Sequence, residues 1–191
     1  MKWIFLCLCA WIMLGCVDVK IASNIDNISY LHLQPQIQSY SCKIPKKLAL
    51  LDIRAMPPYH SNNIYILNSK HIDVLKAQKW IALPQDMLQR AFVFKAKEQC
   101  FEVSMPPLGT QRLQTLLKLS LLSLQIVEEN NTYKAQISVF YELISTNLKS
   151  KSGVIQSSKT IESLSDSHIT QGFALASDEV LIQILRTAQK F

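Results

Sequence analysis

The alternation of hydrophobic and polar residues is clearest in the second half of the chain. Between residues 133 and 143 apolar side chains take every other position, as in a strand with one buried face. The preceding limb, 111–128, also alternates, but its phase shifts at Leu121-Leu122, which predicts a β-bulge. Glu129-Asn130-Asn131 is typical of a turn. The pattern therefore predicts a long hairpin over 111–147, with a bulge in its first strand.

Other short segments also have strand patterns, being apolar or alternating runs bounded by proline, asparagine or serine. They lie at 29–33, 48–55, 63–67, 71–75, 101–104 and 153–163. The segments 63–67 and 71–75 are close enough to pair as a hairpin. The segment 153–163 is polar, so we expect it at an edge of the sheet.

Two segments have the period of amphipathic helices. Pro84 suits the first turn of a helix that runs to about Lys97. The last segment, with Ser167 or Thr170 as its N-cap, runs to about Lys190. Its apolar residues repeat at helical spacing: Phe173, Ala176, Val180, Ile184 and Ala188. The order of elements predicts an α+β fold, with one antiparallel β-sheet and helices packed on one face.

The first sixteen residues follow another pattern. Lys2 precedes an apolar run over 3–14, which is shorter than the ~20 residues a membrane-spanning helix needs. A positive start, an apolar middle and a small residue at the end are typical of a secretory signal peptide. The ending Met13-Leu14-Gly15-Cys16 resembles a bacterial lipobox, in which the cysteine is acylated after cleavage.

This interpretation divides the chain into three parts. We expect residues 1–15 to be a lipoprotein signal peptide, 16–27 a lipidated N-terminus and tether, and 28–191 one α+β domain. The lipid would be attached to Cys16. The alternative is a plain signal peptide or an uncleaved N-terminal anchor. Val17, where inner-membrane lipoproteins carry Asp, favours a periplasm-facing lipoprotein of the outer membrane.

Composition agrees with an exported globular protein. Hydrophobic residues make up 49% and charged residues 18% of the chain. The net charge of +6 is spread over scattered lysines, so we expect no nucleic-acid partner. Cys42 and Cys100 remain after processing, either as a disulfide or as two free thiols. A disulfide would close a loop of about 57 residues and contribute ~4 kcal/mol in the chain-entropy model.

The sequence carries no motif of catalysis. It lacks a glycine-rich phosphate loop and the HExxH, CxxC and GxSxG patterns, and its four histidines have no metal-ligand spacing. We therefore expect neither enzymatic activity nor a cofactor or metal. Trp80 has two interpretations. We favour a core residue between hairpin and helix, and the alternative is an exposed partner surface shared with Tyr59 and Tyr65.

Several features follow one another along the chain: the lipobox, Tyr30-Leu31-His32-Leu33, LALLDIRAMPPY at 48–59, Asn63-Ile64-Tyr65, Trp80 with Pro84, the hairpin 113–146 and the final helix. In this order they resemble the ABC-type transport auxiliary lipoproteins, the PqiC/YmbA-like lipoproteins of MCE lipid-transport systems. The resemblance covers roughly residues 28–190.

The resemblance implies a non-catalytic accessory subunit that works with an MCE-domain protein, an ABC permease and an ATPase to move phospholipid between membranes. A homo-oligomer is compatible with this role, as is direct contact with phospholipid. The segment 153–163, or an aromatic patch of Tyr59, Tyr65 and Trp80, would supply the docking surface. The alternative function is a lipoprotein that regulates envelope assembly or a cell-wall synthase through protein–protein contact.

Overall fold

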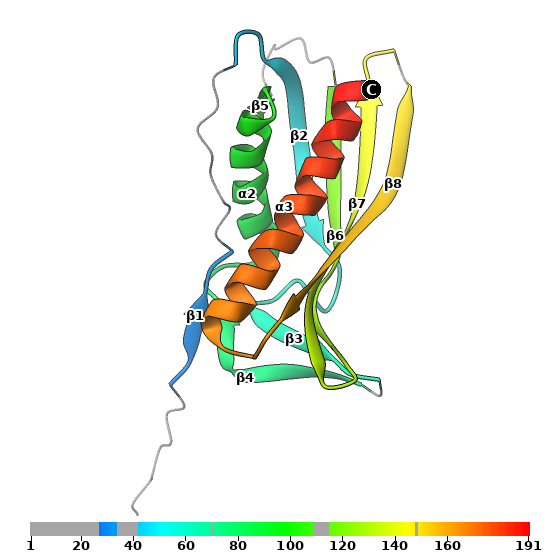
Figure 1. Cartoon of the computed structure of the whole chain (residues 1–191). Coiled ribbons are helices and arrows are strands. Elements are labelled where there is room, and N and C mark those ends of the chain that lie inside the picture. Colours follow the sequence, from blue (N-terminus) through cyan, green and yellow to red (C-terminus); the bar gives the residue numbers. More distant parts are fainter. Residues whose placement is uncertain (1–26, 34–41, 70, 109–114, 148) are drawn as a thin grey trace, which may run out of the picture.

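The computed structural model of the protein describes residues 27–33, 42–69, 71–108, 115–147 and 149–191 (Figure 1). The predicted signal peptide, Cys16 and all of the tether before Asn27 lie outside these residues. Within them, two helices pack against one eight-stranded sheet. The predicted α+β class is therefore confirmed.

The strands lie close to the predicted segments. In chain order they are β1 (Ser29–Leu31), β2 (Lys46–Ala55), β3 (Asn63–Leu67), β4 (Ile72–Trp80), β5 (Phe101–Ser104), β6 (Thr115–Glu129), β7 (Thr132–Ser145) and β8 (Ser150–Ile161). β4 is longer than predicted, because it continues past Leu75 to Trp80. Residues 109–114 of the predicted hairpin limb and Leu148 lie outside the described part of the chain.

The sheet is mixed, so the predicted purely antiparallel arrangement is wrong. β1 pairs with β4 in parallel, and β2 and β3 both pair with β6 in parallel, as does β2 with β5. The β3–β4, β6–β7 and β7–β8 pairs are antiparallel. Period-two alternation reports only that one face of a strand is covered. Strand direction depends on the connections, and the long crossover from β2 to β6, which contains a helix, returns the chain in the same direction.

β6 is the strand around which the sheet is organised. One edge pairs with β7, while the other edge pairs first with β2 over Leu116 to Leu121 and then with β3 over Gln125 to Val127. The register of β6 against β7 shifts between Leu121 and Ser123, which confirms the predicted bulge. The bulge therefore lies where β6 leaves β2 and meets β3.

The turn between β6 and β7 consists of Asn130 and Asn131. Their φ angles of 50° and 58° are both left-handed. Asparagine tolerates this conformation better than most residues, and a two-residue hairpin turn of this kind requires it at both positions. The predicted turn is confirmed.

Helix α2 (Pro84–Glu98) begins with proline in its first turn, as predicted. Helix α3 (Asp166–Lys190) has Ser165 as its N-cap, so the predictions of Ser167 and Thr170 are wrong. The Ser165 hydroxyl accepts a hydrogen bond from the His168 backbone N–H at 3.5 Å. The helix begins about two turns before Phe173, the first residue of the predicted apolar face. The five predicted inner-face residues are all buried.

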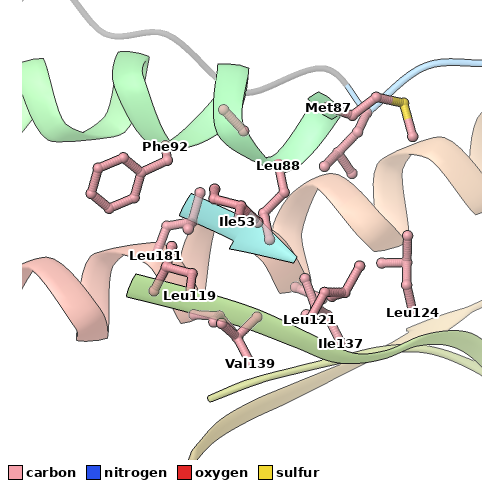
Figure 2. Packing of buried hydrophobic residues seen from close by; sticks show 14 of the residues in the cluster. Ile53, Met87, Leu88, Phe92, Leu119, Leu121, Leu124, Ile137, Val139 and Leu181 are labelled. Carbon is pink, nitrogen blue, oxygen red and sulfur yellow. The ribbon is translucent and has the colours of Figure 1, made fainter. Parts of the chain in front are cut away.

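The core lies between the sheet and the two helices, which lie side by side on one face (Figure 1). Figure 2 shows Leu88 and Phe92 of α2 and Leu181 of α3 in one apolar cluster with Leu119 of β6. Trp80, at the end of β4, meets Phe173 of α3 edge to face at a centroid distance of 5.2 Å. This contact joins the end of β4 to the last helix.

Candidate functional site

The predicted aromatic partner surface is not exposed. Trp80 is 0% exposed and lies in the core, which agrees with the interpretation that we favoured for it. Tyr59 and Tyr65 are also buried and pack edge to face at 5.6 Å. The alternative that these three side chains form a docking surface is therefore wrong.

The two tyrosines lie on the outer face of the sheet, which we define as the face away from the helices. The Tyr59 hydroxyl donates a hydrogen bond to Gln125 Oε1, and Gln125 Nε2 donates to Gln136 Oε1 at 3.2 Å. The Tyr65 hydroxyl donates to the Pro58 carbonyl at 3.0 Å. Burial, together with the neighbouring Tyr65 hydroxyl, raises the pKa of Tyr59. These hydroxyls fasten the segment after β2 onto β3 and β6, which is a structural role.

Cys42 and Cys100 form a disulfide, with an S–S distance of 2.13 Å. It joins the chain ahead of β2 to the turn between α2 and β5, beside a backbone hydrogen bond of 2.9 Å from Lys46 N–H to the Cys100 carbonyl. Both sulfurs are therefore used in a crosslink and neither acts as a nucleophile.

A pocket of about 380 Å³ adjoins this disulfide. Its lining is mainly apolar and consists of Cys42, Pro45, Val93, Lys97, Cys100, Phe101, Glu102 and Val103. The described residues of the lining offer apolar contact and two charged side chains, Lys97 and Glu102.

The most buried charge in the described ranges is Lys95 on α2, whose side chain is 5% exposed. Its ammonium lies 2.8 Å from Glu98 Oε2 and 3.2 Å from Asp178 Oδ2 of α3. Burial by itself would lower the pKa of Lys95, but the hydrogen bonds and negative charges of the two carboxylates outweigh it and hold the pKa above its ordinary value. The lysine therefore stays charged and ties α2 to α3.

The histidines remain apart from one another in the structure. His60 hydrogen-bonds Gln85 at 3.0 Å, His71 lies 2.7 Å from Asp73, and His168 lies 3.6 Å from Glu162. Among the described residues, no group of three or more histidine, cysteine, aspartate or glutamate side chains is placed to hold a metal ion. Within the same ranges, no helix has the length and hydrophobicity to cross a membrane.

β8 is an edge strand, as predicted. It pairs with β7 over its whole length, and its other edge has no strand partner within the described part of the chain. On the helix side, Glu179 of α3 accepts a hydrogen bond from Ser157 at 2.7 Å and pairs with Lys159 at 2.5 Å. The hydrogen bond from Lys159, then that from Ser157, lowers the pKa of Glu179. The contacts with α3 thus hold one face of β8, while its outer edge stays open. This makes β8 a candidate docking strand.

Comparison with solved structures finds the same fold in proteins of low sequence identity. The crystal structure of XCC0632 from Xanthomonas campestris, of the DUF330 family, has a TM-score of 0.70 and 13% identity, over 82% of this chain and 92% of that one. An uncharacterized protein matches with a TM-score of 0.70 and 13% identity, over 85% and 99% of the two chains. CT253 from Chlamydia trachomatis matches with a TM-score of 0.53 and 9% identity, over 75% and 95%.

These likenesses concern the fold. At the level of sequence, no family model and no curated protein matches the chain.

Proposed function

We propose that the protein is a non-catalytic accessory lipoprotein of an ABC/MCE-type phospholipid transport system, held at the periplasmic side of a membrane by a lipid on Cys16. The observation that carries this proposal is the fold shared with XCC0632, a protein of the DUF330 family, to which the PqiC/YmbA-like lipoproteins belong. The match extends over most of both chains.

Two further observations support a place in the cell envelope. The N-terminal residues have the charge, length and Gly-Cys ending of a lipoprotein signal peptide. The domain itself contains the Cys42–Cys100 disulfide, and such bonds persist in oxidising compartments such as the periplasm. The lipobox and the disulfide lie in separate parts of the chain, so they are independent arguments for export.

The open edge of β8 supports a role in assembly. A strand from a partner can add to such an edge through backbone hydrogen bonds, while alternate side chains give specificity. The strand is 12 residues long and is fixed from within by Glu179, so it offers a rigid template. We propose that this edge docks the MCE-domain protein, and that the lipid anchor keeps the domain where the partner can reach it.

The first experiment is a crosslinked pull-down of the tagged, full-length protein from native membranes, followed by mass spectrometry. The proposal expects an MCE-domain protein, an ABC permease or its ATPase among the captured proteins. Recovery of peptidoglycan synthases or barrel-assembly proteins in their place would favour the alternative, a regulatory lipoprotein of envelope assembly. That result would show that the fold is shared without the function.

A site-specific crosslink tests the docking strand. A photo-crosslinking amino acid at Gln156, exposed on β8, should capture the same partner that the pull-down identifies. The matched control is Gln183, which is exposed on α3 and lies away from the open edge. Equal capture from both positions, or capture from Gln183 alone, would show that β8 is not the docking strand.

The anchor has its own test. The variant C16S should lose the acyl label that the wild type carries, while its folded domain keeps the same thermal unfolding transition. Equal acylation of C16S and the wild type, or none on either, would remove the lipoprotein part of the proposal.

A further inference from the structure

A small apolar patch lies on β1 and just after β4, and none of the roles described so far explains it. Tyr30 is 61% and Ile81 57% exposed, and Ile28 is exposed as well. Tyr30 lies beside Lys79 in the parallel β1–β4 register, and the Ile81 backbone N–H donates to the Leu31 carbonyl at 2.9 Å. These contacts continue the pairing of the two segments beyond the end of β4.

The alternation of side chains puts the exposed residues on one face. Leu31 and Trp80, which pair directly with each other, both point into the core. Their neighbours Tyr30, Lys79 and Ile81 therefore point away from it. Ile28 lies two residues before Tyr30 and shares its side of the chain. The patch thus consists of Ile28, Tyr30, Lys79 and Ile81.

This composition fits a lipid surface. Tyrosine places an apolar ring and a polar hydroxyl together and is enriched where membranes meet water. Isoleucine adds apolar area, and lysine can lay its methylene stem along that area while its ammonium reaches a phosphate headgroup. Other exposed apolar residues are Phe140 and Val154, in register on β7 and β8, and Ile72 and Val74 on β4.

The chain leading to the predicted anchor also enters at this patch. Residues 1–26 precede the described domain, and Cys16 lies about a dozen residues before Ile28. A flexible linker of that length has a root-mean-square span of about 20 Å, and even when fully extended it reaches only about 40 Å. A lipid on Cys16 would therefore keep this patch close to the bilayer at all times.

We propose that Ile28, Tyr30, Lys79 and Ile81 form a membrane-contact surface that rests on a bilayer containing anionic phospholipid. This inference rests on the proposed function, because it takes the lipid on Cys16 as given. It adds an orientation for the domain: β1 and the end of β4 face the bilayer. Figure 1 shows β1 on one side of the molecule and the beginning of β8 on the other, with the end of β8 reaching toward the centre.

The test uses the full-length protein, matured in the envelope and reconstituted into vesicles of phosphatidylcholine and phosphatidylglycerol. Part of the phosphatidylcholine carries bromine on its acyl chains and quenches tryptophan that enters the bilayer interface. Y30W should gain a quenched fluorescence component over the wild-type baseline from buried Trp80. V154W, which replaces a residue of similar exposure (58%), is the matched control and should not.

A second variant separates contact from mere tethering. Adding K79E and I81S to Y30W should reduce the quenched fraction severalfold, because the two changes remove the cation and an apolar side chain from the surface. Acylation and vesicle recovery should stay the same, because both changes are at exposed or half-exposed positions and leave the fold intact. Quenching that is equal in Y30W and V154W, or unaffected by K79E and I81S, overturns the inference and leaves the proposed function intact. Absence of acylation on Cys16 overturns both.

Discussion

Gly172 of α3 lies directly against Ile161, the last residue of β8: a Cβ added to the glycine would come within 2.3 Å of the isoleucine Cγ2. It would also come within 3.0 Å of the Ala135 Cβ on β7. The helix can approach the end of the sheet this closely because residue 172 has no side chain. This contact sets how deeply α3 lies over β7 and β8.

G172A should therefore destabilise the protein, by about 1–3 kcal/mol for overpacking. The direction of the change in stability is informative, because replacing Gly by Ala within a helix otherwise stabilises a protein by roughly 1 kcal/mol. Q171A, at the exposed neighbouring position, is the control and should change stability by less than about 0.5 kcal/mol. Urea unfolding measures both, and a G172A protein more stable than wild type would show that α3 does not lie this close to β8.

The buried Lys95 should matter more than a surface ion pair of similar geometry. K95M keeps the length of the side chain but removes the cation shared by Glu98 and Asp178, which should cost about 3 kcal/mol. The Lys118–Glu142 pair on the sheet surface has a distance of 3.3 Å, and K118M should cost less than about 1 kcal/mol. Denaturant unfolding of the two variants side by side gives the comparison, and equal losses would contradict the role of Lys95 in holding α2 against α3.

The acid dependence of stability should include a contribution from Glu179. Its folded-state pKa lies below the ordinary 4.5, so the stabilisation is present above the unfolded-state value and is lost as the pH falls through the folded-state value. E179Q should therefore be less stable than wild type near neutral pH and should lose less stability on acidification. K159M should have the same effect, because the hydrogen bond from Lys159 is the main cause of the shift. Unfolding midpoints from neutral pH to about pH 3 provide the measurement, and parallel curves for wild type and E179Q would contradict it.

The disulfide should account for a large part of the stability of the domain. The two cysteines are 58 positions apart, for which the chain-entropy model gives about 4 kcal/mol. The double variant C42S/C100S should unfold at a lower denaturant concentration than the oxidised wild type, and reduced wild type should match the variant. Mass spectrometry of non-reduced peptides shows whether the bond is present, and a variant as stable as oxidised wild type would contradict the prediction.

Local patterns predicted most of the elements. The phase shift at Leu121-Leu122 located the bulge, the asparagine pair located the turn, and the apolar repeat from Phe173 to Ala188 located the buried face of α3. In each case the signal comes from neighbouring residues, for which backbone geometry alone decides which side chains share a face.

Features that depend on distant residues could not be predicted in the same way. Tyr59 is buried because its hydroxyl meets Gln125, which lies 66 positions later on another strand. The sequence left two possibilities for Cys42 and Cys100, since the distance between them depends on how α2 returns the chain to β5. The proposed membrane-contact surface likewise needs the β1–β4 pairing, which brings Tyr30 beside Lys79.

β6 has hydrogen-bonded neighbours on both edges for most of its length, so its amide protons can exchange with solvent only when the sheet itself comes apart. β2 and β3 pair with successive segments of the same edge of β6, before and after the bulge. Neither part of the sheet can therefore open independently of the other. The amides between Leu116 and Val127 should be the last to exchange in deuterated buffer, at a common rate that reports global unfolding. The three-residue strand β1, in contrast, pairs with β4 over three positions and should exchange early.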